Sequence, residues 1–122
     1  MTNSEAFMMN ETIFDKILAR KIPAQIVFED DDVLAFRDIH PLAKIHVLVI
    51  PKRKAISFVD FQEWPPFEVG LFFQKVAKVA AHLGLARDGF RIVMNSGLNG
   101  GQTVDYAHVH ILGGESLSGG FA

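Results

Sequence analysis

The amino-acid sequence predicts an α+β fold, with a five-stranded antiparallel sheet, one short helix and one long helix. Five short segments rich in β-branched and aromatic residues outnumber the two segments that have helical periodicity. These segments do not alternate regularly, as strands and helices do in folds built on a parallel sheet. The sequence contains no internal repeat, and its 122 residues fit a single domain over residues 1–122.

The first predicted element is a short amphipathic helix that begins after Thr12. Threonine is a common N-cap residue, because its hydroxyl accepts a hydrogen bond from a free amide of the first turn. Phe14, Ile17 and Leu18 then recur on one helical face. Pro23 ends the pattern, because proline lacks the backbone donor that a helix requires.

Three strands are predicted to follow this helix. Residues 25–29 and 33–37 form a hairpin, because the aspartates at 30–32 between them favour a turn. Residues 45–50 read IHVLVI and are apolar at every position except His46. Such a segment is typical of a central strand that is covered on both faces.

The second half of the chain contains the long helix and the last two strands. Residues 67–83 carry apolar side chains at a spacing of three and four, and Gly84 ends the pattern. We expect this helix to pack its apolar face against the sheet. Residues 90–95 and 107–112 are the remaining predicted strands, and residues 96–101 between them form a glycine-rich loop.

Composition excludes several classes of function. Twelve Lys and Arg residues against fourteen Asp and Glu residues give a formal net charge of −2, which argues against binding of extended nucleic acid. The absence of cysteine excludes disulfides, thiolate zinc sites and thiol nucleophiles. No apolar run approaches the roughly 20 residues that cross a bilayer. No basic residue precedes Lys16, so we expect no targeting segment, no membrane association and a cytoplasmic location.

A His-x-His pair lies on the last predicted strand. Because side chains alternate along a strand, His108 and His110 are expected to project from the same face. The pair is compatible with two metal ligands, with a nucleophile and an assisting imidazole, or with polar residues on a solvated face. A metal site would require a third ligand, which His46 or His40 could supply, but no carboxylate is obvious near the pair. The spacing by itself leaves all three interpretations open.

The residues around this pair resemble the signature of the histidine triad (HIT) family. Residues 101–114 read GQTVDYAHVHILGG, whereas the family motif is His-φ-His-φ-His-φ-φ, in which φ is an apolar residue. Further matching blocks occur in the family's order at residues 12–17, 22–24, 28–31, 34–39 and 46–52. The chain looks most like the Hint branch of nucleotide-binding phosphoramidases, on the evidence of residues 13–14, 22–24 and 112–114.

This resemblance implies a hydrolase that cleaves purine nucleoside 5′-phosphoramidates of the AMP type through a nucleotidyl-histidine intermediate. His108 matches the nucleophile, and we expect a backbone carbonyl near Tyr106 to hold its other ring nitrogen. His110 and His46 match residues that contact phosphate oxygens. The resemblance assigns phosphate binding or placement of the leaving group to Asn95, Gly101, Gln102 and Thr103, and it counts Gln102 and Thr103 with the catalytic residues.

The same resemblance places the nucleoside. Asp38 matches a carboxylate that accepts hydrogen bonds from the two ribose hydroxyls. The apolar walls around the purine correspond to Phe14, Ile17, Ile22, Phe36, Ile39 and Leu48, for which core packing is the competing explanation. His40 has no matching role and is expected to be exposed.

The resemblance implies no metal and no cofactor. It does imply a homodimer in which two five-stranded sheets join as a ten-stranded sheet, with the helices of residues 67–83 at the interface. The chain departs from the family pattern at Tyr106, which replaces the first histidine, and in residues 115–122, which lack a Trp-Pro-Pro ending. The alternatives are a non-catalytic purine nucleotide-binding regulatory protein, a dinucleoside polyphosphate hydrolase and a histidine metal-binding protein.

Overall fold

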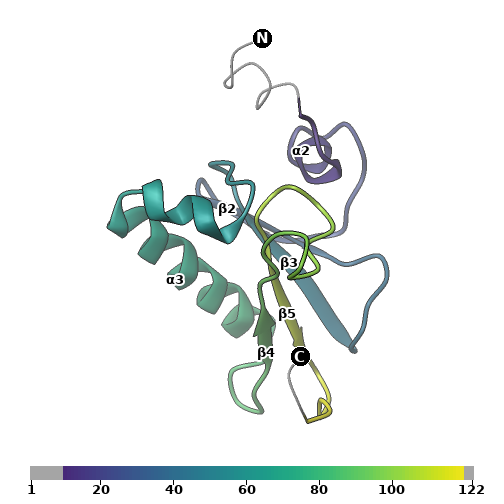
Figure 1. Ribbon diagram of the computed structural model, residues 1–122. Helices are drawn as coiled ribbons and strands as arrows, with labels where there is room; N and C mark the ends of the chain where they lie inside the picture. Colours follow the sequence, from purple (N-terminus) through teal and green to yellow (C-terminus); the bar gives the residue numbers. More distant parts are fainter. Residues whose placement is uncertain (1–9, 120–122) are drawn as a thin grey trace.

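A five-stranded antiparallel sheet forms the centre of the computed structural model, which describes residues 10–119 (Figure 1). The end of the 115–122 tail therefore lies outside the described residues. The strands are β1 (Ile26–Glu29), β2 (Val33–Arg37), β3 (Ile45–Pro51), β4 (Arg91–Val93) and β5 (Val109–Gly113). Their order across the sheet is β1-β2-β3-β5-β4, and every neighbouring pair is antiparallel. The predicted fold class is confirmed.

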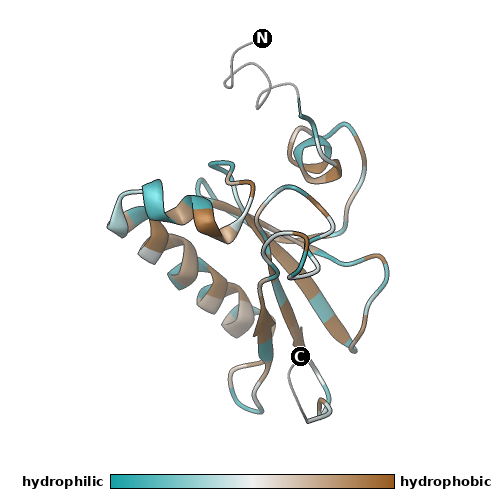
Figure 2. Ribbon diagram, in the orientation of Figure 1, coloured by the Kyte–Doolittle hydropathy of each residue, from teal (hydrophilic) through white to brown (hydrophobic). Residues whose placement is uncertain are grey.

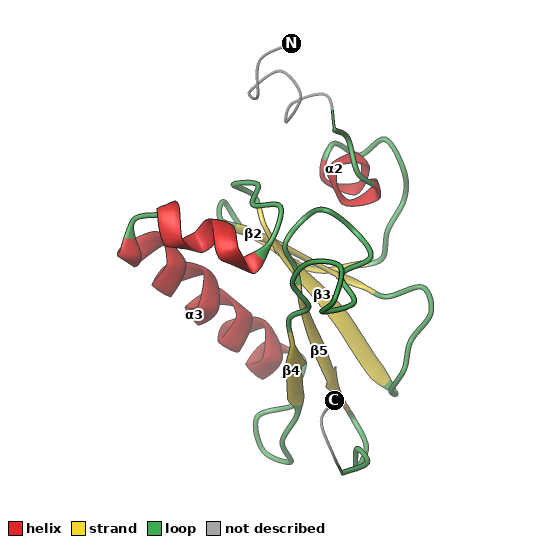
Figure 3. Ribbon diagram, in the orientation of Figure 1, coloured by secondary structure: helices red, strands yellow, loops and turns green. Residues whose placement is uncertain are grey.

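The predicted helices are present as α2 (Ile13–Leu18) and α3 (Pro66–His82). A 3₁₀ helix, η1 (Phe58–Glu63), was not expected, because six residues are too few to show helical periodicity. Within residues 10–119, no helix has the length and apolar character needed to span a bilayer. Figure 3 shows α3 alongside the sheet and α2 apart from it, near the loops at one end.

The short helix α2 begins with a capping box. The Thr12 hydroxyl accepts a hydrogen bond from the Asp15 amide at 3.2 Å, and the Asp15 carboxylate accepts one from the Thr12 amide at 2.7 Å. These two bonds satisfy amides that a helix N-terminus otherwise leaves free. Lys54 Nζ lies 2.8 Å from Asp15 Oδ2, which ties this helix to the segment that follows β3.

Four of the predicted strands have different bounds in the structure, and the ends of β4 and β5 differ most, by two residues. Strand β4 covers three residues instead of 90–95, because it is an edge strand and its pairing stops where Val93 lies opposite His110. Strand β5 begins at Val109, so His108 lies immediately before it. This placement leaves the backbone around His108 outside the regular ladder.

Strand β3 is covered on both faces, as its sequence predicts. Figure 2 shows it mainly in the brown of hydrophobic residues. Val47 and Val49 belong to the cluster of apolar side chains that packs beneath α3. Leu48 and Ile50 point to the opposite face and belong to a second cluster that includes side chains of α2. The sheet therefore separates two apolar clusters, and the histidines described below lie on the face of the second one.

We predict that Ile111→Ala lowers the free energy of unfolding by about 2–5 kcal/mol, because it leaves a cavity in the middle of β5. Ile111 is 0% exposed. Leu98→Ala is the matched control, because Leu98 is 92% exposed and its truncation should change stability by less than about 0.5 kcal/mol. Urea denaturation measures both variants, and equal midpoints would contradict the assignment of the core.

Candidate active site

Three histidines meet on the face of the sheet that carries the second cluster. Leu48 on β3 pairs with His110 on β5, and His46 pairs with Leu112. The centroid of the His110 ring lies 5.2 Å from that of His46 and 5.1 Å from that of His108. The predicted placement of His108 and His110 on one face is confirmed, and His46 joins them because β3 and β5 are neighbours.

The backbone holds the ring of His108 in one tautomer. Its Nδ1 lies 2.6 Å from the carbonyl oxygen of Tyr106, which confirms the predicted acceptor. A carbonyl can only accept, so Nδ1 carries the hydrogen and Nε2 keeps a free lone pair. The side chain is 4% exposed, and burial lowers the pKa of His108. The ring is therefore a neutral imidazole with its nucleophilic nitrogen defined.

A chain of hydrogen bonds fixes the protons of the other two imidazoles. The Leu42 amide donates to His46 Nδ1 at 3.0 Å, so the neutral His46 ring carries its hydrogen on Nε2. That nitrogen lies 2.9 Å from Nδ1 of His110, which must accept the bond. The hydrogen of His110 is consequently on Nε2, where it is available to a ligand.

Burial keeps these two rings neutral. It lowers the pKa of His46, against the opposing effect of the Asp38 carboxylate. The pKa of His110 falls to about 4, first through burial and then through the neighbouring His108 and His46. The three rings are therefore uncharged at neutral pH, and they act through directed N–H groups and lone pairs.

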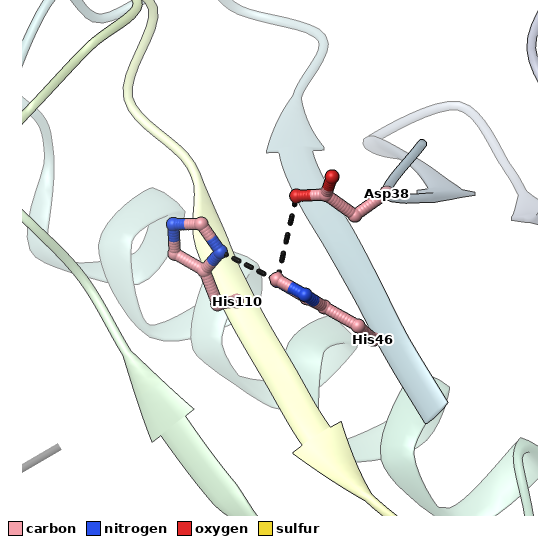
Figure 4. Close-up of side chains that lie close together, drawn as sticks. All are labelled: Asp38, His46 and His110. Carbon is pink, nitrogen blue, oxygen red and sulfur yellow. Dashed lines mark hydrogen bonds and ion pairs between the residues drawn. The ribbon is translucent and has the colours of Figure 1, made fainter. Parts of the chain in front are cut away.

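Asp38 joins His46 and His110 in a cluster, and Figure 4 shows these side chains in front of the strands. Asp38 follows β2 directly, and its Oδ2 lies 3.5 Å from His46 Nε2. No carboxylate was obvious near the histidines in the sequence, and the pairing of β2 with β3 is what places this one there. The possible ligand atoms lie within 4.8 Å of one another, but the His46 and His110 nitrogens already form a hydrogen bond with each other. His40 is exposed, as expected, and does not belong to this cluster.

A cavity of ≈250 Å³ opens beside His108 and His110. Its polar lining includes Asp38 and Thr103. Every residue predicted to surround the purine lines it, namely Phe14, Ile17, Ile22, Phe36, Ile39 and Leu48. Phe14, Ile17, Phe36 and Leu48 are also buried members of the second cluster, so one set of side chains serves both packing and the cavity wall.

The side chain of Gln102 shapes the glycine-rich loop. Its Nε2 donates to the carbonyls of Ile56 and Val104 at 2.6 and 2.9 Å, and its Oε1 accepts from the Gly97 amide at 2.8 Å. All three bonds go to backbone groups, so in this structure the amide holds the loop in place. Thr103, the next residue, is the one that lines the ≈250 Å³ cavity.

Asn95 lines a second cavity of ≈530 Å³ together with His46 and His110. Its Nδ2 donates to the Gly100 carbonyl at 2.8 Å. Gly101 has a φ of 78°, a conformation that favours glycine. Of the predicted phosphate and leaving-group residues, Asn95 therefore lines one cavity and Thr103 the other, Gly101 and Gln102 line neither, and His110 lines both.

Several groups around the histidines were not identified from the sequence. The Leu42 amide, which donates to His46, and the Pro51 carbonyl, which accepts from the Tyr106 hydroxyl, are backbone groups, and no side-chain pattern reports them. Val104 lines the cavity without having been predicted. The side chain of Tyr106 was noted only as a departure from the motif, although a carbonyl near this residue was expected to hold His108.

Comparison with known proteins agrees with this architecture. Residues 19–117 match the family model described as HIT domain. The chain is 44% identical over 110 residues to the purine nucleoside phosphoramidase of Escherichia coli K12, covering 90% of this chain and 92% of that protein. The structure of a HIT family hydrolase from Legionella pneumophila superposes with a TM-score of 0.81 at 39% identity, covering 87% of this chain and 95% of that one. A HIT family hydrolase from Clostridium thermocellum superposes with a TM-score of 0.84 at 35% identity, covering 93% and 99%. The chain therefore belongs to the HIT domain family.

Proposed function

We propose that this protein hydrolyses purine nucleoside 5′-phosphoramidates of the AMP type through a nucleotidyl intermediate on His108. The observation that carries the proposal is the bond between His108 Nδ1 and the Tyr106 carbonyl, which leaves Nε2 as a free nucleophile beside an apolar cavity. The similarity to a relative named purine nucleoside phosphoramidase supports this substrate class.

The first step is attack by His108 Nε2 on the α-phosphorus. A bond between Nε2 and phosphorus forms while the phosphoramidate P–N bond breaks, and the leaving amine departs with a proton taken from solvent, which the second step returns. The ring then carries a positive charge, which its Nδ1–H shares with the Tyr106 carbonyl. In the second step water attacks the phosphorus, the bond to Nε2 breaks, and the nucleoside monophosphate and a proton are released.

The surrounding residues hold the substrate for this attack. The Nε2–H of His110 donates to a phosphate oxygen, because its Nδ1 is occupied by His46. Asp38 keeps acceptor capacity for the ribose hydroxyls beyond the bond that Oδ1 accepts from the His40 amide at 2.8 Å. The apolar walls of the cavity enclose the purine, and the Thr103 hydroxyl contributes a polar contact at the same cavity.

Two other functions fit the same cavity. A regulatory protein that only binds a purine nucleotide would bind AMP without turnover. A dinucleoside polyphosphate hydrolase would cleave diadenosine tri- or tetraphosphate faster than an adenosine phosphoramidate. Parallel assays with these substrates therefore distinguish the three functions.

We predict that His108→Ala abolishes AMP release from an adenosine phosphoramidate, because it removes the attacking nitrogen. The matched control is His40→Ala, which removes an exposed imidazole outside the site and should retain activity. Mass spectrometry of rapidly quenched wild-type protein should show one nucleotidyl group on His108. Full activity in His108→Ala would exclude this nucleophile.

We predict that kcat/KM stays constant as the pH is lowered from 8 through about 6.5, the ordinary pKa of histidine. Burial lowers the pKa of all three imidazoles, so they become protonated, and His108 loses its lone pair, only at more acidic pH. Because the three rings are in contact, the fall in kcat/KM at acidic pH reports the titration of the three histidines together, and not of one of them. A pH series with circular dichroism as a check on folding measures it, and an acid limb centred above 6.5 would contradict the proposal.

We also propose that the protein forms a homodimer through the edge of its sheet. Strand β4 is at the end of the strand order, and no described residue pairs with its outer edge. Ile92 on this strand is 51% exposed. An unpaired edge with an exposed apolar side chain favours pairing with the same edge of a second copy, which would produce the ten-stranded sheet.

Light scattering coupled to size-exclusion chromatography should give twice the mass of the chain. Ile92→Lys should shift the protein toward the monomer, because it places like charges at the two-fold contact. Lys16→Ala on α2 is a control for general effects of surface charge, because this exposed lysine lies outside the expected interface. A wild-type monomer at every concentration tested would disprove the dimer.

A further inference from the structure

We propose that Tyr106 is a positioning residue whose hydroxyl group orients the nucleophile His108. In this view the tyrosine replaces the first histidine of the family motif functionally, by supplying a buried hydrogen-bond donor. The inference rests on the proposed function, in which His108 attacks phosphorus. It concerns a residue that the motif marks only as a departure.

The side chain of Tyr106 is anchored to the central strand of the sheet. It is 0% exposed, and its hydroxyl donates to the carbonyl of Pro51 at 2.5 Å. Pro51 is the last residue of β3, which pairs with both β2 and β5. The hydroxyl therefore connects the loop that precedes β5 to the end of β3, where Pro51 pairs with Val33 of β2.

The peptide group between Tyr106 and Ala107 is held from both of its ends. The Ala107 amide donates to the Ala55 carbonyl at 2.7 Å, and the Tyr106 carbonyl accepts from His108 Nδ1 at 2.6 Å. Because the amide and the carbonyl lie in one rigid plane, the bond to Ala55 also sets the direction of the carbonyl. Hydrogen bonds in such a series polarise one another, so the carbonyl becomes a stronger acceptor for the imidazole.

The anchored ring also supports the wall of the cavity. Phe14 packs edge-on against both Tyr106 and His108, with centroid distances of 6.4 and 5.0 Å. Lys54 Nζ lies 5.6 Å from the centre of the tyrosine ring and bonds to Asp15 of the capping box. Tyr106 and the nucleophile therefore both contact Phe14 of the helix that covers the cavity.

Position 106, where the family motif has its first histidine, requires a side chain that donates a hydrogen bond. Tyrosine and histidine both carry a side-chain hydrogen-bond donor, whereas phenylalanine fills similar space and carries none. Burial raises the pKa of Tyr106, so the hydroxyl keeps its hydrogen. Removing that hydroxyl leaves the Pro51 carbonyl without this donor and frees the loop that carries the Tyr106 carbonyl.

The test compares Tyr106→Phe and Tyr106→His with the wild-type protein. We expect Tyr106→Phe to lower kcat roughly 10- to 100-fold with little change in KM, because a misaligned nucleophile slows the chemical step. Tyr106→His should restore most of the lost kcat. Ile50→Val is the control, because it thins the same buried cluster without removing a hydrogen bond, and its kcat should match the wild type.

The second readout is the tautomer of His108, observed by ¹⁵N NMR of histidine-labelled protein. The chain has five histidines, and His108→Ala identifies the relevant signal. The wild-type ring should carry its hydrogen on Nδ1. In Tyr106→Phe the signal should move toward the mixture of tautomers of a free imidazole, whereas a purely structural role would leave it unchanged.

The outcomes separate this inference from the proposed function. If the wild-type protein is active and Tyr106→Phe keeps both kcat and the tautomer, the inference is wrong and the function stands. If Tyr106→His is much more active than the wild type, tyrosine is an inactivating replacement, and the inference is again wrong. If neither the wild-type protein nor any variant cleaves phosphoramidate, the proposed function fails. The tautomer of His108 in the Tyr106→Phe variant still decides the role of the hydroxyl.

Discussion

The hydrogen bond from His108 Nδ1 to the Tyr106 carbonyl is the interaction on which the site depends. It assigns the single N–H hydrogen of the neutral ring to Nδ1 and leaves Nε2 with a free lone pair. A carboxylate partner, as in a serine protease triad, would add a buried charge. The peptide carbonyl orients the ring without one, which suits a side chain that is almost completely removed from water.

Burial makes this arrangement possible for all three imidazoles. Each has a lowered pKa, so the cluster of His46, His108 and His110 is not a cluster of positive charges. Hydrogen bonds then assign every proton, from the Leu42 amide through His46 to His110. The result is a rigid array of donors and one lone pair, which needs little reorganisation when charge develops on a phosphate.

His110 lines both cavities, and under the proposed function each cavity would hold a different part of the substrate. The ≈250 Å³ cavity has the apolar walls and the Asp38 carboxylate that suit a nucleoside. The ≈530 Å³ cavity lies beyond His46 and His110 and is lined by Asn95 and by polar residues near the C-terminal end of the described chain. In the proposed complex, substrate atoms beyond the phosphate have room in this second cavity. The side chain of Gln102 is occupied by the hydrogen bonds that hold the glycine-rich loop.

The sequence alone determined the five strands, both helices, the shared face of His108 and His110 and apolar residues that line the ≈250 Å³ cavity. Hydrophobic periodicity is local, and the ordered motif blocks occur within single segments, so both can be read along the chain. Tertiary structure decided that Asp38 lies beside His46, that Gln102 turns toward the loop, and that Tyr106 is anchored to Pro51. These contacts join segments up to 55 residues apart, often through backbone groups, as in the bond from Tyr106 to Pro51. Such groups are the same in every residue, so only the path of the folded chain determines which side chain each one meets.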